Sequence, residues 1–216
     1  MIDERPPHLA YNPIAAEYAA DSDDPALRAR CRGRLLESLP GKQVLEVGCG
    51  PGHDAHALAA EGCCVTAIDL CTPFLDSARQ MYPEVDFRVM DLRAPDFLEG
   101  HFDGIIGLAC FCHLTSDEVA STVRRYAQLL SPGGVFLAWL SDSEKVDGYT
   151  VQEWGGCPDN PVSIVCHNRD FLHSHLEAAG FEDVQIISEH SDYYNGIPRI
   201  QEHGIQLYVA KGIMPS

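Results

Sequence analysis

The chain lacks any apolar segment long enough to cross a bilayer. Its longest hydrophobic runs, such as GIIGLACF at 104–111, fall well short of the roughly 20 residues that a membrane-spanning helix needs. The N-terminal residues MIDERPPHLAYNP also show no basic segment followed by an apolar one, which is the pattern of a secretory signal. We therefore expect a cytoplasmic protein that does not bind a membrane.

Positive charge is scarce as well. Lysine and arginine together number 15 against 32 aspartate and glutamate residues, so the formal net charge is −17. A protein that follows a phosphate backbone needs a basic stripe, and the sequence contains none. The composition argues against nucleic acid as a partner and is typical of an acidic, well-solvated surface.

Paired cysteine motifs are absent, although the chain contains nine cysteines. The number is odd and no two cysteines are spaced as C-x-x-C, which argues against both a disulfide framework and a zinc site. The histidines show no spacing that assembles a metal site either. We expect reduced cysteines that are mostly buried in the core, and no bound metal.

Strand-like and helix-like segments alternate between residue 43 and about residue 140, which predicts a parallel sheet with crossover helices. We expect strands at 43–47, 63–68, 85–90, 102–109 and 134–140, and helices at 53–61, 73–81 and 116–130. Ser116 is the expected N-cap of the last helix, which ends before the breaker sequence SPGG. A chain of 216 residues without a repeat or linker most simply forms one α/β domain.

The flanking segments add helices at 11–20, 24–39 and 168–180 and strands at 182–188 and 204–212. Residues 141–166 and 189–203 are expected to be irregular, and long irregular segments in a compact domain are usually functional or mobile. Their aromatic and imidazole side chains either shape a substrate pocket or anchor the loops: Trp154, His167, Tyr193 and Tyr194. The two tyrosines also precede the turn dipeptide Asn195–Gly196, so the alternative is that they flank a hairpin tip.

A cluster of glycines in VLEVGCGPG, residues 44–52, stands where the first strand passes into a helix. Gly48, Gly50 and Gly52 allow a tight turn and let a ligand lie against bare backbone. The dinucleotide fingerprint is G-x-G-x-x-G, whereas this turn reads G-x-G-x-G and places His53 at the third glycine position. The turn therefore predicts a nucleotide-like ligand other than NAD or FAD.

Carboxylates stand at the ends of the first three strands. Glu46 precedes Gly48 by two residues at the end of the first strand. Asp69 ends the second strand, where a carboxylate can accept hydrogen bonds from both hydroxyls of a ribose. Asp91 follows the third strand, where it can accept a hydrogen bond from an adenine amino group. Together with the glycine turn, these positions favour a nucleoside ligand.

In this order and spacing, VLEVGCGPG, AIDL, VMDL, FDGIIGLACFCHL and LLSPGGVFLAWL resemble the class I S-adenosylmethionine-dependent methyltransferases that act on small molecules. YNPIAAEY, near the start, is similar to the family's N-terminal helix, so the resemblance covers nearly the whole chain. It implies a Rossmann-like seven-stranded fold with helices on both faces and an N-terminal helical cap. The single domain, 1–216, would comprise cap helices at 1–40, a cofactor-binding core at 41–140, and a substrate-side insertion with the C-terminal strands at 141–216.

The resemblance also implies a site for S-adenosyl-L-methionine. Gly48, Gly50 and Gly52 would contact its methionine part. Asp69 would hold the ribose with Leu70 beside the adenine, while Asp91 and Leu92 would bind the adenine edge and face.

Four further positions complete this implied site. Ala109 and Cys110, at the end of the fourth strand, would carry a backbone carbonyl towards the methionine amino group. Tyr18 would lie over the cofactor. Glu46 either contacts the cofactor or organises the glycine loop through backbone N–H groups.

His113 is the candidate general base, because in the resembled family this position faces the transferable methyl group and the substrate. Its unperturbed pKa of ~6.5 lets it accept a proton at neutral pH, although it could also simply pack or bind the cofactor carboxylate. Tyr11, the second candidate catalytic residue, would share a helix face with Tyr18, either as a lid or as core packing. Alignment alone can be worth roughly 7–11 kcal/mol, so the reaction does not strictly need a base.

Cys110 and Cys112 alternate in sequence and would share one face if the fourth strand continued through them. Beside His113 they could suggest metal or arsenic chemistry, but a role in strand packing is favoured.

These observations predict in-line methyl transfer from S-adenosylmethionine to an O, N, S or C nucleophile of a small molecule, such as a secondary metabolite. The alternative is a cyclase or lyase that uses the same cofactor and releases methylthioadenosine. A non-catalytic cofactor-binding subunit and a nicotinamide reductase are less favoured. The methyl acceptor and the oligomeric state, monomer or homodimer, are left open.

Overall fold

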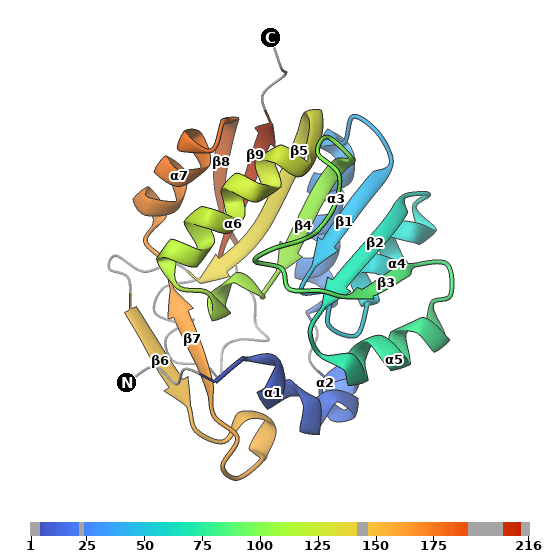
Figure 1. Ribbon diagram of the computed structural model, residues 1–216, viewed down its shortest axis with the longest axis vertical. Helices are drawn as coiled ribbons and strands as arrows, with labels where there is room; N and C mark the ends of the chain where they lie inside the picture. Colours follow the sequence, from blue (N-terminus) through green and yellow to red (C-terminus); the bar gives the residue numbers. More distant parts are fainter. Residues whose placement is uncertain (1–4, 22–23, 142–146, 190–204, 213–216) are drawn as a thin grey trace.

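The computed structural model describes residues 5–21, 24–141, 147–189 and 205–212. Its main sheet has seven strands in the order β3-β2-β1-β4-β5-β9-β8 (Figure 1). The strands are β1 (Gln43–Val47), β2 (Cys64–Asp69), β3 (Asp86–Val89), β4 (Phe102–Leu108), β5 (Leu130–Ser141), β8 (Phe181–Glu189) and β9 (Ile205–Gly212). The predicted α/β architecture around a parallel sheet is confirmed.

The order of the strands creates a switch point between β1 and β4. From β1 the chain builds outward through β2 and β3, and then returns to place β4 on the other side of β1. The five strands from β3 to β5 are parallel to their neighbours, whereas β9 runs antiparallel to both β5 and β8. Ligands of open α/β sheets bind at the carboxyl ends of the strands beside such a switch point, which here means the ends of β1 and β4.

Helices cover both faces of the sheet, and for this reason the central strands are apolar almost throughout. Along β1, Val44 packs into the layer on one face while Leu45 and Val47 pack into the layer on the other. The first layer contains α3 (Pro25–Ser38), α4 (His53–Ala60) and α5 (Thr72–Met81). The second contains α6 (Ser116–Leu129) and α7 (Arg169–Ala178), which lie in front of the sheet in Figure 1.

Two predictions about the helices are wrong in detail. The expected single helix at 11–20 is broken into α1 (His8–Tyr11), the 3₁₀ turn η1 (Asn12–Ile14) and α2 (Ala15–Asp21), because Pro13 cannot donate a helical hydrogen bond. The N-cap of α6 is Thr115 and not Ser116. Thr115 forms a capping box with Glu118, which stands three residues later, as that motif requires.

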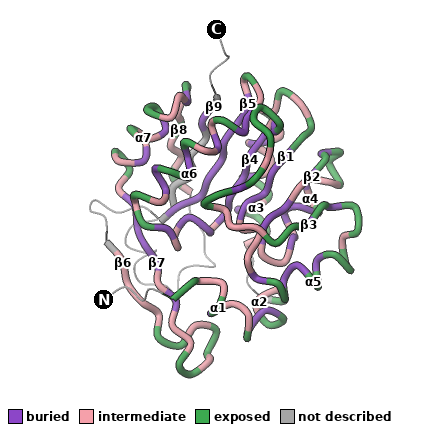
Figure 2. Tube along the Cα trace, viewed as in Figure 1, coloured by how far each residue is buried: buried purple, intermediate pink, exposed green. Residues whose placement is uncertain are grey.

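Residues 141–166 are not simply irregular, which corrects the prediction. They contain β6 (Asp147–Val151) and β7 (Val162–Cys166), which pair antiparallel as a separate two-stranded sheet, and between them the 3₁₀ turn η3 (Trp154–Gly156). This hairpin lies with α1 and α2 beyond one end of the main sheet (Figure 1). Figure 2 shows that β7 is largely buried. The hairpin and the N-terminal helices together therefore cover that end.

Some predictions fall outside the described residues. These are the irregular run after Glu189, together with Tyr193, Tyr194 and the dipeptide Asn195–Gly196. All nine cysteines lie within the described part, where they are free thiols and six of them are buried. Among the helices that are described, none combines the length and the apolar character that a bilayer-spanning segment requires.

Candidate functional site

A cavity opens at the end of the main sheet that the strand order marks. Its free space, counted with the solvent at its mouth, is about 1070 Å³, enough for a small-molecule site. It is lined by the glycine turn after β1, by the residues that follow β2, β3 and β4, and by the N-terminal segment that includes Pro7, His8, Tyr11 and Tyr18. The structure thus gathers most of the predicted site residues around one space.

The three glycines serve different purposes, although all three have positive φ angles. A Cβ atom at Gly48 would lie 2.4 Å from the Cβ of Cys110, and one at Gly52 would lie 2.6 Å from the ring of Phe87. At Gly50 a Cβ would meet nothing within 4 Å. Gly48 and Gly50 line the cavity, whereas Gly52 does not and packs against β3 instead. The bare backbone offered to a ligand is therefore centred on Gly50.

Asp69 links the end of β2 to the glycine turn. Its carboxylate accepts hydrogen bonds from the backbone N–H groups of Gly50, at 2.8 Å, and Cys71, at 2.7 Å. Burial raises the pKa of Asp69, and these backbone hydrogen bonds partly oppose that shift. A carboxylate offers about four lone-pair positions, so capacity remains for the hydroxyls of a ligand. Leu70, the next residue, also lines the cavity.

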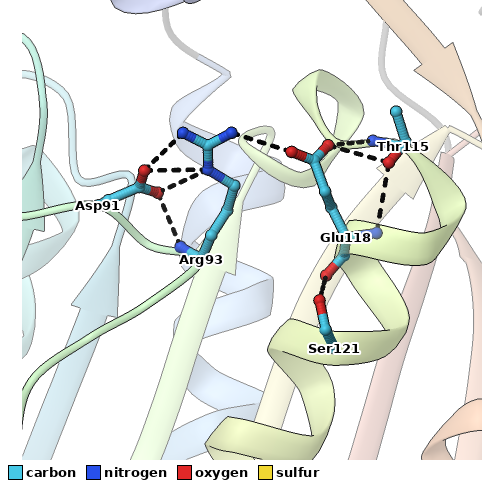
Figure 3. A network of polar contacts seen from close by, with 5 residues as sticks. All are labelled: Asp91, Arg93, Thr115, Glu118 and Ser121. Atoms are coloured by element: carbon cyan, nitrogen blue, oxygen red, sulfur yellow. Dashed lines mark hydrogen bonds and ion pairs between the residues drawn. The ribbon is translucent and has the colours of Figure 1, made fainter.

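Asp91 is held in place by a network that the sequence did not predict. Arg93 binds its carboxylate through both the backbone N–H and the guanidinium, and reaches Glu118 at the start of α6 (Figure 3). Burial tends to raise the pKa of Asp91, but the hydrogen bonds from Arg93 outweigh it and the pKa lies below its ordinary value. Asp91 is therefore ionised and fixed beside Leu92 on the cavity wall.

Tyr11 and His113 form a hydrogen-bonded pair on the cavity wall. His113 ends the 3₁₀ turn η2 (Phe111–His113), and its Nε2 lies 3.0 Å from the hydroxyl of Tyr11. Its Nδ1 lies 3.0 Å from the carbonyl oxygen of Ser163 on β7. Because a carbonyl can only accept, Nδ1 carries the hydrogen, and Nε2 accepts from Tyr11. Burial lowers the pKa of His113, which keeps the ring neutral at pH 7.

Aromatic rings surround Tyr11. The ring of Tyr18 lies 5.1 Å away, that of Trp154 at 5.7 Å and that of Phe74 at 6.1 Å, measured between centroids. The prediction that Tyr11 and Tyr18 share a face of one helix is wrong, because η1 separates α1 from α2, but the two rings are in contact. Tyr18 and Phe74 line the cavity, while Trp154 packs on Tyr11 from the hairpin without lining it.

A buried group of charges lies beneath the glycine turn. Asp54 on α4 is 1% exposed and pairs with both Arg28 and Arg32 of α3. Glu46 is 3% exposed, does not line the cavity, and its Oε2 has no hydrogen-bond partner among the described residues. Burial, reinforced by the charge of Asp54, raises the pKa of Glu46 well above its ordinary value. Sequence reasoning missed Arg28 and Asp54, which both reach the cavity.

The end of β4 differs from expectation. The strand stops at Leu108, Ala109 adopts a φ of +60°, and η2 follows, so Cys110 and Cys112 do not share a strand face as predicted. The thiol of Cys110 donates to the carbonyl oxygen of Val47 at 3.3 Å, and that of Cys112 donates to the carbonyl oxygen of Ala109 at 3.3 Å. Burial raises the pKa of both thiols, to about 12 for Cys112. Ala109 and Cys110 do line the cavity.

His167 is buried and contacts the carbonyl oxygen of Phe111 through Nε2 at 3.2 Å. It does not line the cavity, and its contact with Phe111 instead holds the first residue of η2 in place. Within the described ranges, no three His, Cys, Asp or Glu side chains gather in a way that could hold a metal ion.

Comparison with known proteins gives a consistent result. Residues 44–134 match the family model described as a methyltransferase domain. A ubiquinone biosynthesis O-methyltransferase of Xanthomonas campestris is 35% identical over 146 residues, which cover 64% of this chain and 53% of the relative. The chain thus spans about half the length of the curated relatives it matches.

Solved structures show the same fold. A SAM-dependent methyltransferase of Methanosarcina mazei superposes with a TM-score of 0.70 at 13% identity, covering 84% of this chain and 98% of that one. A phosphoethanolamine N-methyltransferase of Haemonchus contortus, solved with S-adenosyl-L-methionine, gives 0.69 at 17% identity, covering 96% of this chain and 57% of the other. At such identities the likeness concerns the fold alone.

Proposed function

We propose that this chain, whose residues 44–134 match a methyltransferase domain, is a class I S-adenosylmethionine-dependent methyltransferase that transfers the methyl group of its cofactor to a nucleophilic atom of a small molecule. One observation carries the proposal. The cavity brings the open backbone of Gly50 and the carboxylate of Asp69 together with the Tyr11–His113 pair. A binding surface for a nucleoside and a proton acceptor thus share one space.

The residues on the wall fit S-adenosyl-L-methionine. The space beside the Cα atom of Gly50 is open, since a Cβ built there would meet nothing within 4 Å, and Asp69 keeps lone pairs for ribose hydroxyls. Leu70 and Leu92 provide apolar walls for adenine, and Asp91 provides an acceptor for its amino group. Tyr18, Ala109 and Cys110 line the same cavity, as a cofactor-binding role requires. When bound, the cofactor supplies a methyl group already activated by the positive sulfur.

The Tyr11–His113 pair would remove the proton of the acceptor. The hydroxyl oxygen of Tyr11 can accept a hydrogen bond from an acceptor hydroxyl while it donates to Nε2 of His113. As the acceptor proton passes to Tyr11, the proton of Tyr11 passes to Nε2, and the Ser163 carbonyl holds the ring in the required tautomer. General-base help of this kind is worth about 10²–10⁴-fold in rate.

The acceptor class that the cavity favours is an uncharged hydroxyl compound with an apolar, planar body. The Tyr11–His113 end is walled by aromatic rings, including Tyr18 and Phe74. Among the described residues, the acids and arginines that line the cavity lie on α3 and α4, at the end of β2 or after β3, whereas Tyr11 and His113 come from α1 and η2: Arg28, Asp54, Asp69, Asp91 and Arg93. Relatives named as O-methyltransferases support oxygen as the accepting atom.

The test is to incubate the full chain with S-adenosylmethionine carrying a labelled methyl group and a panel of phenols, amines, thiols and carboxylic acids. We expect label on a phenolic oxygen, with S-adenosylhomocysteine as the other product by mass spectrometry. Tyr11→Phe should lower the turnover number by about 10²-fold or more and leave the affinity for S-adenosylhomocysteine unchanged. Tyr82→Phe, a residue outside the cavity, is the matched control.

Two results would contradict this proposal. Release of methylthioadenosine instead of S-adenosylhomocysteine would assign the chain to cyclase or lyase chemistry. If calorimetry detected no binding of S-adenosylmethionine or S-adenosylhomocysteine, the assignment of S-adenosylmethionine as the cofactor would be wrong.

A further inference from the structure

His8 stands on the cavity wall and has no part in the chemistry proposed above. It is the first residue of α1, three positions before Tyr11, and it lines the cavity from the N-terminal segment. The carboxylates at the ends of β2 and β3, Asp69 and Asp91, line the same cavity from the sheet side. His8 therefore belongs to the covering layer of the site, which is made of the N-terminal helices α1 and α2 and the β6–β7 hairpin, and not to the main sheet on the other side of the cavity.

The Nδ1 atom of His8 is buried, yet it has no hydrogen-bond partner among the described residues. A buried polar atom without a partner loses its hydrogen bonds to water and is destabilising, and such atoms are rare in folded proteins. Nδ1 is a ring nitrogen that can either donate or accept, depending on the tautomer. On a cavity wall, the natural partner for such an atom is a polar group of the ligand.

The position of His8 relative to the two carboxylates indicates which end of the ligand it meets. The imidazole of His8 is near enough to both Asp69 and Asp91 to contribute to a lowering of the pKa of each carboxyl, so it lies on the side of the cavity where β2 and β3 end. Under the proposed function, these two carboxylates bind the ribose and the adenine. Because His8 lies near Asp91 as well as Asp69, it meets the adenosine end of the ligand.

We propose that His8 is a cofactor-binding residue of the covering segment, whose Nδ1 forms a hydrogen bond with the adenosine portion of the ligand. This inference rests on the proposed function, since it takes the cavity to be a S-adenosylmethionine site. The hydrogen bond satisfies Nδ1 only when ligand is present, so it draws the N-terminal segment onto the bound nucleoside. His8 thereby adds to affinity from the side opposite the sheet.

The test compares His8→Ala and His8→Asn by calorimetry with two probes. S-adenosylhomocysteine contains the whole product, whereas methylthioadenosine contains adenosine without the amino-acid part. His8→Ala should raise the Kd for both probes by the same factor, about three- to tenfold. His8→Asn should restore affinity to within about twofold of the native chain, because the amide of asparagine overlays Nδ1 and keeps a polar atom there.

Leu9→Ala is the matched control, since Leu9 is the next residue of α1 and its side chain is 49% exposed. It should leave both affinities unchanged, and the unfolding temperatures of all ligand-free variants should agree within a few degrees. Unchanged affinity in His8→Ala would overturn the proposal, and so would weaker binding of S-adenosylhomocysteine with normal binding of methylthioadenosine. If the native chain bound neither probe, the cofactor assignment itself would fail, which is a different result.

Discussion

The state of a single ring nitrogen decides whether His113 can act as a base. The sequence offers only a histidine after the fourth strand, and either nitrogen of a free imidazole can carry the hydrogen. The Ser163 carbonyl makes the choice, because it holds the hydrogen on Nδ1 and leaves the lone pair of Nε2 towards Tyr11. That carbonyl lies 50 residues further along the chain, on a strand that the sequence did not predict.

The pH dependence of turnover follows from the burial of His113. Burial lowers its pKa below the ordinary 6.5, so the ring stays neutral, and able to accept a proton, down to pH values below 6.5. At saturating cofactor, the turnover number should therefore be constant near pH 7 and fall to half at a pH below 6.5. His113→Asn should remove this acidic limb along with most of the activity. A midpoint at or above pH 6.5, or a limb that survives in His113→Asn, would exclude His113 as the base.

Substitution of Gly50 can distinguish the effect of backbone strain at a positive φ from the effect of blocking a bound ligand. Gly50→Ala introduces a Cβ that meets nothing within 4 Å, at a φ of +52°. Gly100→Ala does the same at +64°, away from the cavity. Both should lower the free energy of unfolding by a similar amount, about 1–2 kcal/mol. Only Gly50→Ala should weaken the binding of S-adenosylhomocysteine in calorimetry, by about tenfold or more. Equal affinities in the two variants would contradict the assignment of Gly50 to the ligand.

The sequence predicted the helices and strands well where the pattern of apolar residues depends only on neighbouring residues in the chain. The alternation of apolar runs and amphipathic segments gave β1 at its observed bounds and placed the other strands of the core within a few residues. The hairpin was missed because Gly, Pro and Asn between residues 141 and 166 suggested loop, while VSIVC forms a strand only by pairing with residues 147–151. A strand whose partner is a short, polar segment leaves a weak periodic signal.

At the scale of elements, Asn160 connects the hairpin to the N-terminal segment. Its amide nitrogen donates to the carbonyl oxygen of Ala10, at 2.9 Å, and to that of Trp154, at 3.0 Å. Ala10 directly precedes Tyr11, so this contact fixes the backbone that presents the tyrosine to His113. The covering layer is thus assembled from two segments 150 residues apart.

We expect Asn160→Ala to loosen that layer. It should raise the KM for the methyl acceptor several-fold, shift the fluorescence of Trp154 to longer wavelength, and lower the melting temperature by roughly 2–4 °C. Asn168→Ala is the control, because Asn168 caps α7 through its side chain and its loss costs a similar ~1 kcal/mol. The control should melt earlier but keep its KM. If both variants changed KM alike, the effect would reflect lost stability and not the covering layer.

On the face of the main sheet that α3, α4 and α5 cover, the whole fold brings together buried charged side chains that no local sequence pattern predicts. Arg28, Arg32 and Asp54 come from two helices and meet only when both pack on the sheet. The sequence places Glu46 correctly at the end of β1 but does not reveal its neighbours, so it leaves open whether Glu46 contacts the cofactor or organises the glycine turn. In the folded chain, Glu46 lies under the glycine turn and outside the cavity lining.

The raised pKa of Glu46 makes stability depend on pH in a definite direction. The folded chain holds the proton of Glu46 more tightly than the unfolded chain, whose carboxyl has a pKa near 4.5. The corresponding stability is fully present below that value and is lost as the pH rises through the folded pKa. Glutamine carries no charge at any pH. The free energy of unfolding of Glu46→Gln, relative to the native chain, should therefore increase from about pH 5 to about pH 8 in urea titrations without ligand.

Asp54→Asn provides the opposite case within the same buried group. It removes the shared carboxylate partner of Arg28 and Arg32, so it should destabilise the chain by about 3–5 kcal/mol. The two substitutions replace buried carboxyl groups of the same site, one without an ion-pair partner among the described residues and one paired with two arginines. If Glu46→Gln were also destabilising, or if its advantage did not grow with pH, the Glu46 carboxyl would have to be paired in the folded chain. Its role would then be to organise the glycine turn, the alternative that the sequence left open.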